Sequence, residues 1–281
     1  MIIDHETNLV YFSQMLKTNP YYGETCSQIL RILKKHGIAY QFLHKTKDIW
    51  TRDYMPVQIS DNRFVQFQYI LDYLKNNPEL RSEPQVVCNA NKIKPIYSNI
   101  VLDGGNIIKW KDKVIVTDKV YLDNPQYKSA HQLIDGLETI LEAEVIIIPR
   151  IKAEFTGHAD GLVRFLDSQT ITGNDLSFEY KYWREGMEKV LKQYHIEYIN
   201  MPTFEYKDKK YPDTAIGCYT NYLEVKNVII FPVFETKHNK DQQAIDLITD
   251  IYPNKIIEPI NINPVANQGG LMNCISWNIS I

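Results

Sequence analysis

The chain has 281 residues with a formal net charge of −3, and 44% of them are hydrophobic and 23% charged. This balance is ordinary for a globular protein and lacks the basic excess typical of nucleic-acid binders. No apolar run reaches the ~18 residues needed to span a bilayer, and the first residues do not resemble a secretory signal. We therefore expect a cytoplasmic protein that binds neither membranes nor nucleic acids.

The chain contains four cysteines, namely Cys26, Cys88, Cys218 and Cys274. They form no CxxC pair and no tight cluster. In a chain of this length without a secretory signal, free thiols are expected rather than disulfides or a structural zinc site.

A hairpin, a helix and a strand recur in the same order along the chain. The hairpin patterns lie at 53–69, 106–117, 161–172 and 221–234; the helical patterns at 125–143, 178–194 and 239–251; the closing strands at 145–149, 196–201 and 255–257. The helix after the first hairpin is weakly marked, and we expect the stretch 75–95 to be partly loop.

The two chain ends supply the parts of a fifth unit. A final strand pattern at 271–281 has no helix after it, whereas the N-terminal part has a helix at 24–35 and a strand at 38–43. A period of about fifty to sixty residues is typical of a radial repeat array, here of five units closed by joining the chain ends. An ordinary mixed α/β domain would give a similar alternation.

Unusual polar residues lie where the hairpins begin. If the units are arranged radially, these places converge on one point and form one site. The segments are Trp50-Thr51-Arg52-Asp53, Asp103-Gly104-Gly105, His158-Ala159-Asp160, and Gly269-Gly270 before Cys274.

Each segment has a plain alternative when it is taken alone. On an extended backbone His158 and Asp160 would point to the same face, as a base and carboxylate pair would require. They could equally be a core histidine with a turn aspartate, or a metal pair, although no further ligands stand out. Cys274 begins an apolar strand pattern, and free cysteines are often simply buried. Asp53 and Asp103 could belong to turns.

Taken in order, the segments WTRDYMP, LDGGN, TGHADGLVRF and GGLMNC resemble the motifs of the agmatine deiminase and bacterial peptidylarginine deiminase-type family. GCYTNYLEVKNVIIFPVF, at 217–234, is similar to the hairpin of that family's fourth unit. The resemblance runs from about Asp48 to Cys274. It implies an α/β fold of the pentein, or α/β-propeller, type, with five ββαβ-type units in a single catalytic domain over residues 1–281.

The resemblance also implies roles for individual residues. Cys274 matches the nucleophile and His158 the general acid/base, while Asp103 stands where the family usually has a glutamate that orients the histidine. Asp53 and Asp160 match the carboxylates that hold the guanidinium. The substrate-binding set expected from the sequence is Trp50, Arg52, Asp53 and Asp160.

These residue types suit a guanidinium substrate. A guanidinium is planar and charged, and two carboxylates can bind its N–H groups with charge-assisted hydrogen bonds. A thiolate can attack the central carbon, and an imidazole can move the protons. The implied reaction converts a guanidine, agmatine or a related arginine derivative, into a ureido product and ammonia without a metal or cofactor.

Several alternatives stay open. The enzyme could act on protein-bound arginine, transfer the amidino group to an amine, or be a non-catalytic pentein that binds a partner. A papain-like protease fits poorly, because such proteins usually have the cysteine before the histidine. Specificity is expected from the loops 75–95, 203–216 and 259–268, and a homo-oligomer is left open.

Overall fold

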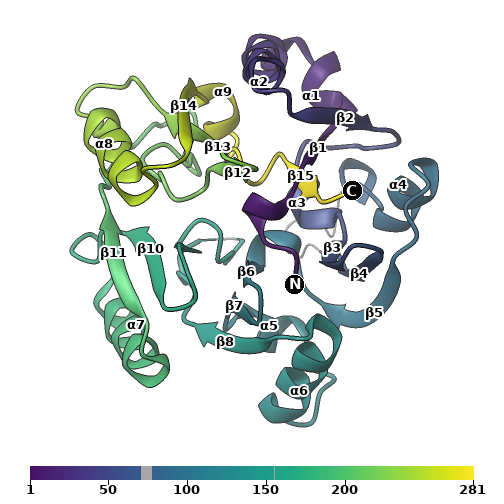
Figure 1. Cartoon of the computed structure of the whole chain (residues 1–281). Coiled ribbons are helices and arrows are strands. Elements are labelled where there is room, and N and C mark those ends of the chain that lie inside the picture. Colours follow the sequence, from purple (N-terminus) through teal and green to yellow (C-terminus); the bar gives the residue numbers. More distant parts are fainter. Residues whose placement is uncertain (71–77, 155) are drawn as a thin grey trace.

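The computed structural model describes residues 1–70, 78–154 and 156–281. Five three-stranded sheets surround a central axis, as the blades of a propeller do (Figure 1). In each sheet an antiparallel pair of strands is followed by a third strand that pairs in parallel with the second. The five-unit pentein architecture predicted from the sequence is therefore confirmed.

Four sheets are formed by consecutive strands. They are β3 (Val57–Ser60), β4 (Arg63–Gln68) and β5 (Ile96–Val101); β6 (Ile108–Trp110), β7 (Lys113–Thr117) and β8 (Glu144–Ile148); β9 (Val163–Phe165), β10 (Thr170–Asn174) and β11 (Glu197–Met201); and β12 (Leu223–Val225), β13 (Val228–Val233) and β14 (Ile256–Asn261).

Two of the hairpin turns are tight and contain a residue with left-handed backbone. Trp110 pairs with Lys113 across a turn in which Lys111 has φ 28°. Val225 pairs with Val228 across a turn in which Lys226 has φ 53°. Two-residue turns with positive φ match the twist of the strands they join, which fixes the register of these hairpins.

The fifth sheet joins the two ends of the chain. β15 (Trp277–Ile279) pairs antiparallel with β1 (Leu9–Ser13), and Leu9 lies opposite Ile279. β2 (Ala39–Leu43) then pairs in parallel with β1. The predicted closure between the chain ends is confirmed, whereas strand β1 itself was not foreseen.

The helices correspond to most of the predicted ones. α2 (Gly23–Lys35), α7 (Lys181–Tyr194) and α8 (Asp241–Ile251) lie where helices were expected. The helix predicted at 125–143 was too long. The helix in this segment is α6 (Ala130–Leu141), and a separate short helix, α5 (Lys119–Asp123), lies before it. In the stretch 75–95, α4 (Pro84–Ala90) is helical, and residues 75–77 lie outside the described part of the chain.

The helices fill the spaces between neighbouring sheets. Leu133 and Leu137 of α6 are buried in one cluster with Val65 of β4 and Val114 of β7. α7 buries Trp183, whose Nε1 donates to the Pro149 carbonyl oxygen at 2.7 Å. Each of these two helices thus ties its own unit to the preceding one.

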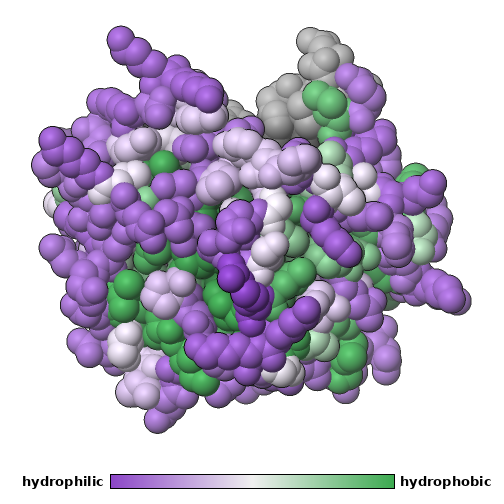
Figure 2. Space-filling view, turned by 90° about the horizontal axis from the view of Figure 1, so that it is seen from above, coloured by the Kyte–Doolittle hydropathy of each residue, from purple (hydrophilic) through white to green (hydrophobic). Residues whose placement is uncertain are grey.

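The face seen in Figure 2 carries mainly hydrophilic side chains, with hydrophobic ones showing between them. Among the described helices, none combines the length and the apolar character required to cross a bilayer.

Candidate active site

Residues from several units line one cavity of about 790 Å³. Asp53 comes from the first unit, and His158 and Asp160 come from the third. Cys274 lies before β15 and Trp50 lies after β2, so both belong to the fifth unit. The convergence expected from the positions of the hairpins is therefore present. Asp103 lies directly behind His158 and does not line the cavity.

Asp53 lies on a short helix, α3 (Thr51–Tyr54), and not at the beginning of a strand as the sequence indicated. The Asp48 carboxylate accepts from the Trp50 backbone N–H at 2.8 Å and stabilises the turn that precedes α3. The Gly105 backbone N–H donates to Asp53 Oδ1 at 3.2 Å. A Cβ on Gly105 would lie only 2.5 Å from His158 Nδ1 and 2.6 Å from Asp53 Oδ1, so this position requires glycine.

His158 and Asp160 lie in an irregular segment and not on the extended backbone that the sequence predicted. Gly157 has φ 61°, a conformation suited to glycine. The Gly157 carbonyl oxygen accepts from Thr117 Oγ1 at 2.6 Å, and the Asp160 N–H donates to the Gly105 carbonyl at 3.0 Å. Both side chains reach the cavity because these bonds hold the segment against the second unit.

The His158 ring lies between two carboxylates. Its Nε2 is 2.9 Å from Asp103 Oδ2, and its Nδ1 is 3.7 Å from Asp53 Oδ1. Burial alone would lower the pKa of His158. Asp53 and Asp103, with a smaller effect of Asp160, outweigh it and raise this pKa from 6.5 to about 10. The ring is therefore an imidazolium at neutral pH.

The carboxylate side chains on the cavity wall outnumber the positively charged side chains there. Burial raises the pKa of Asp53 to about 8, against the attraction of His158, and the nearby Asp103 and Asp160 carboxylates add to the rise. At neutral pH the empty cavity thus favours the protonated Asp53. A bound cation would reverse that preference.

Cys274 lies in a turn that precedes β15, and not at the beginning of a strand as predicted. Its Sγ is 3.6 Å from Asp160 Oδ2. Burial, together with the Asp160 and Asp53 carboxylates, raises the pKa of Cys274 well above its usual range. Cys274 is therefore favoured as a thiol at neutral pH, and a cation in the cavity would favour the thiolate.

Asn221 is a site residue that the sequence interpretation missed. Its Oδ1 accepts from the backbone N–H groups of Asn273 and Cys274 at 3.0 and 3.4 Å. These bonds direct the Asn221 amide nitrogen towards Cys274 Sγ, at 3.3 Å. The Asn273 side chain holds Asp160 Oδ2 at 2.8 Å. The only sequence signal was the position of Asn221 in the hairpin motif of the fourth unit.

Trp50 and Arg52 differ in where they lie. Trp50 lines the cavity and packs on Gly270, where an added Cβ would lie 2.3 Å from the indole Cζ3. Arg52, expected from the sequence to contact substrate, lies outside this cavity. It turns away from it and binds Asn273 and Asn278.

The rest of the cavity wall combines apolar side chains, such as Ile151 and Leu271, with acidic ones. Glu154, Glu179 and Asp213 contribute to it, and among the described residues no lysine or arginine does. The described part of the chain also contains no group of three or more His, Cys, Asp or Glu side chains that could hold a metal ion.

A five-bladed α/β-propeller whose blades bring a cysteine, a histidine and carboxylates to one cavity is a protein of the pentein class, which comprises guanidino-group-modifying enzymes. Residues 14–279 match the family described as Porphyromonas-type peptidyl-arginine deiminase, and the chain belongs to that family.

Individual relatives agree with this assignment. A protein of Photobacterium profundum named "Putative agmatine deiminase" is 25% identical over 224 residues, which are 69% of this chain. The chain spans only about 61% of the length of that curated relative.

Solved structures share the fold. The C. jejuni agmatine deiminase has a TM-score of 0.77 at 18% identity, covering 99% of this chain and 94% of that one. An agmatine deiminase of Enterococcus faecalis has a TM-score of 0.76 at 16% identity, with 99% and 94% covered. DDAH from Pseudomonas aeruginosa has a TM-score of 0.58 at 10% identity, with 97% and 99% covered. A variant of the C. jejuni enzyme has been solved with its substrate bound.

Proposed function

We propose that the protein is a guanidine deiminase that hydrolyses agmatine, or a closely related guanidine, to a ureido compound and ammonia. The observation that carries the proposal is that Cys274, His158, Asp53 and Asp160 line one cavity. The known members of the family support the reaction class, and the acidic cavity wall supports the charge of the substrate.

In the proposed mechanism, Asp53 and Asp160 hold the guanidinium and the Cys274 thiolate attacks its central carbon. The positive substrate offsets the charges of the carboxylates and favours release of the thiol proton to solvent, since His158 is already protonated. The His158 imidazolium then donates a proton to the departing nitrogen, which leaves as ammonia. The neutral imidazole takes a proton from water, which attacks the S-alkylthiouronium carbon and expels the Cys274 thiolate with the ureido product.

The cavity wall favours agmatine over free arginine. Agmatine carries an ammonium group at its far end, whereas arginine carries a carboxylate there as well. The wall offers Glu154, Glu179 and Asp213 and, among the described residues, no lysine or arginine to pair with that carboxylate. An unpaired carboxylate in an acidic cavity is disfavoured.

Protein-bound arginine is the second candidate, because the matched family is described as peptidyl-arginine deiminase. Ammonia release should be measured side by side with agmatine, free arginine, an arginyl peptide and an alkylguanidine. We expect the highest kcat/KM with agmatine. A higher value with the arginyl peptide would assign the second candidate.

The chemistry itself is tested with Cys274→Ala. This variant should still bind agmatine, seen as a rise in Tm with added ligand, while turnover falls by about 10⁴-fold or more, as expected when a covalent nucleophile is removed. Binding without any turnover in the wild-type protein would indicate a non-catalytic pentein. Residual turnover near the wild-type rate in Cys274→Ala would refute the covalent mechanism.

A further inference from the structure

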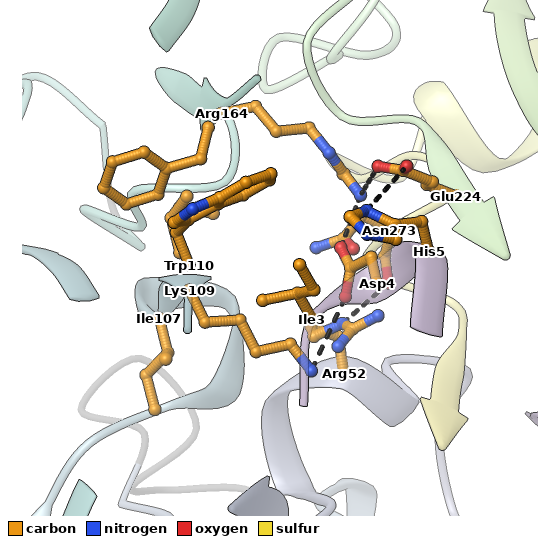
Figure 3. Close-up of a pocket in the computed structure, with 12 residues that line it drawn as sticks. Ile3, Asp4, His5, Arg52, Ile107, Lys109, Trp110, Arg164, Glu224 and Asn273 are labelled. Carbon is orange, nitrogen blue, oxygen red and sulfur yellow. Dashed lines mark hydrogen bonds and ion pairs between the residues drawn. The ribbon is translucent and has the colours of Figure 1, made fainter. Parts of the chain in front are cut away.

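A second, smaller cavity of about 30 Å³ is lined by charged residues near the axis (Figure 3). It is formed by the innermost strands of neighbouring sheets, each of which turns the middle residue of a short strand inward. Lys109 comes from β6, Arg164 from β9 and Glu224 from β12. Asp4 reaches the same place from η1 (Asp4–Glu6), a single turn of 3₁₀-helix.

The cations in this cavity outnumber the carboxylates. Arg52, Lys109 and Arg164 line it together with two acids, Asp4 and Glu224. Glu224 is shared, because it lies 4.0 Å from Arg164 and also forms an ion pair with Lys255, which lies outside the cavity. Asp4 is therefore the main counter-charge for three buried cations. They hold the pKa of the Asp4 carboxyl well below its usual range, although burial acts against them.

Asp4 touches two of the three cations directly. Arg164 Nη2 donates to Asp4 Oδ2 at 2.5 Å, and Lys109 Nζ is 3.5 Å from Asp4 Oδ1. Figure 3 shows the two side chains reaching Asp4 from different sheets. Charges this deeply buried interact over longer distances than surface pairs do, so the balance also includes Arg52, whose guanidinium lies on the same cavity.

Arg52 connects this charge cluster to the nucleophile. Its Nε donates to the Asn273 carbonyl at 3.3 Å, its backbone N–H donates to the Cys274 carbonyl at 3.0 Å, and its Nη2 donates to Asn278 Oδ1 at 2.5 Å. Arg52 therefore binds the turn that carries Cys274 on the side away from the catalytic cavity, and its side chain is buried among other cations.

We propose that Asp4 is a positioning residue for Cys274. Its carboxylate balances the buried cations, which keeps the Arg52 guanidinium on the Asn273 carbonyl and fixes the turn of the nucleophile. The inference rests on the proposed function only in taking Cys274 as the nucleophile. It assigns to the turn Asp4–Glu6, which does not line the catalytic cavity, a part in the reaction.

Loss of the Asp4 charge should have two effects. Arg52, Lys109 and Arg164 would repel one another with only Glu224 left in the cavity to offset them, and Arg52 would be displaced from the carbonyl that it holds. The uncompensated positive charge would also favour the thiolate form of Cys274. If Asp4 only stabilised the fold, the molecules that remain folded after its substitution would show neither effect.

The test compares Asp4→Asn with Glu6→Gln. Glu6 lies on the same turn, is exposed, and binds the Ile3 N–H at 3.2 Å and Lys111 at 3.6 Å, away from the cluster. Both variants lose one carboxylate charge from η1. In Asp4→Asn we expect kcat on agmatine to fall at least about tenfold with KM within about threefold, because small displacements of a reacting group are costly. Glu6→Gln should keep the wild-type values.

The second readout is alkylation of Cys274 by iodoacetamide as a function of pH, with Cys274→Ala as the blank for the other thiols. The midpoint should move to lower pH in Asp4→Asn and stay unchanged in Glu6→Gln. This measurement needs no turnover, so it still tests the positioning role if the wild-type protein deiminates none of the guanidines offered. In that case the proposed function is wrong, and the alkylation profile alone decides whether Asp4 positions Cys274.

Unchanged kcat and an unchanged alkylation profile in folded Asp4→Asn would overturn the proposal, as would equal effects in Glu6→Gln. If Asp4→Asn does not fold, the double variant Asp4→Asn/Lys109→Met restores the original charge difference in the cavity. That variant should fold and recover the wild-type alkylation midpoint. If it folds with the midpoint displaced, or does not fold either, charge balance is not the cause and the proposal is wrong.

Discussion

His158 Nε2 lies 2.9 Å from Asp103 Oδ2, on the side of the ring away from the catalytic cavity, so that Nδ1 is the nitrogen that faces Asp53 and the cavity. Nδ1 is therefore the atom that we expect to exchange a proton with substrate. Asp103 holds the ring in this orientation and stabilises its protonated form.

The first prediction concerns this pair. Asp103→Asn keeps the shape of the side chain but removes one of the charges that, with Asp53, raise the pKa of His158. We expect kcat on agmatine to fall by about 10²-fold, the lower range for loss of acid–base catalysis. The limb of the pH–rate profile that reports loss of the His158 proton should move to lower pH.

Asp103→Glu is the matched control, because it restores a carboxylate at this position. It should retain more activity than Asp103→Asn and a pH–rate profile closer to that of the wild type. Equal profiles in the wild type and Asp103→Asn would show that Asp103 does not set the proton affinity of His158.

The second prediction concerns stability as a function of pH. The pKa of His158 is about 10 in the folded protein and 6.5 ordinarily, so the folded state binds the proton more tightly. The contribution of this group to the free energy of unfolding is fully present below about pH 6.5 and is lost as pH rises towards 10. The slope is at most about 1.4 kcal/mol per pH unit.

The contribution of His158 is isolated by comparing denaturant unfolding of the wild type and His158→Gln at several pH values. The difference in unfolding free energy between them should shrink as pH rises from 6.5 to about 10. A constant or growing difference over this range would mean that the imidazolium is not stabilised by the carboxylates around it.

The third prediction concerns proton release on binding. With a pKa of about 8, Asp53 is mostly protonated in the empty cavity at pH 7. A guanidinium held between Asp53 and Asp160 favours the carboxylate, so binding should release up to about one proton. Calorimetry of agmatine binding to Cys274→Ala, in buffers of different ionisation enthalpy, measures this release without interference from turnover.

The same titration at about pH 9.5 is the control, because Asp53, with a pKa of about 8, is then ionised before the ligand arrives. The release from Asp53 should disappear there, and any proton still released comes from His158, whose pKa is about 10. Binding that releases no proton at neutral pH would show that Asp53 is already ionised in the free protein.

The repeat pattern favoured the five-unit fold over an ordinary mixed α/β domain, and the resemblance of the motifs to a known family completed that prediction. Each hairpin, helix and strand carries its own local signal, as the apolar face of α6 with Leu133, Leu137 and Leu141 illustrates. Strand β1 was missed because it has only five residues, Leu9–Ser13, and is defined by pairing with β15 at the other end of the chain. Pairing between segments so far apart in the chain produces no pattern in the local sequence.

The positions of the site residues could be predicted, but their local conformations could not. Asp53 was expected on a strand and lies on α3. Asp48 stabilises the turn before this helix, and the bond from the Arg52 N–H to the Cys274 carbonyl holds the helix itself. Asp4 gave no signal of its own, and the only signal for Asn221 was its position in the hairpin motif of the fourth unit. Their importance depends on contacts with residues far away in the sequence, such as Cys274 and Arg164.

The final prediction concerns the wall formed by Trp50. Gly270 packs against the indole, and a Cβ there would lie 2.3 Å from Cζ3, so Gly270→Ala must displace the ring. Overpacking of this kind costs about 1–3 kcal/mol. Because Trp50 lines the cavity, we expect KM for agmatine to rise by about tenfold, with a smaller change in kcat.

Two further variants separate this effect from general damage. Gly23→Ala serves as the control, since a Cβ on Gly23 meets no atom within 4 Å, and its kinetics should match the wild type. The double variant Gly270→Ala/Trp50→Ala should behave like Trp50→Ala alone, because the second substitution removes the ring that the first displaces. Additive effects of the two substitutions on KM would mean that Gly270 acts on the cavity by a route other than Trp50.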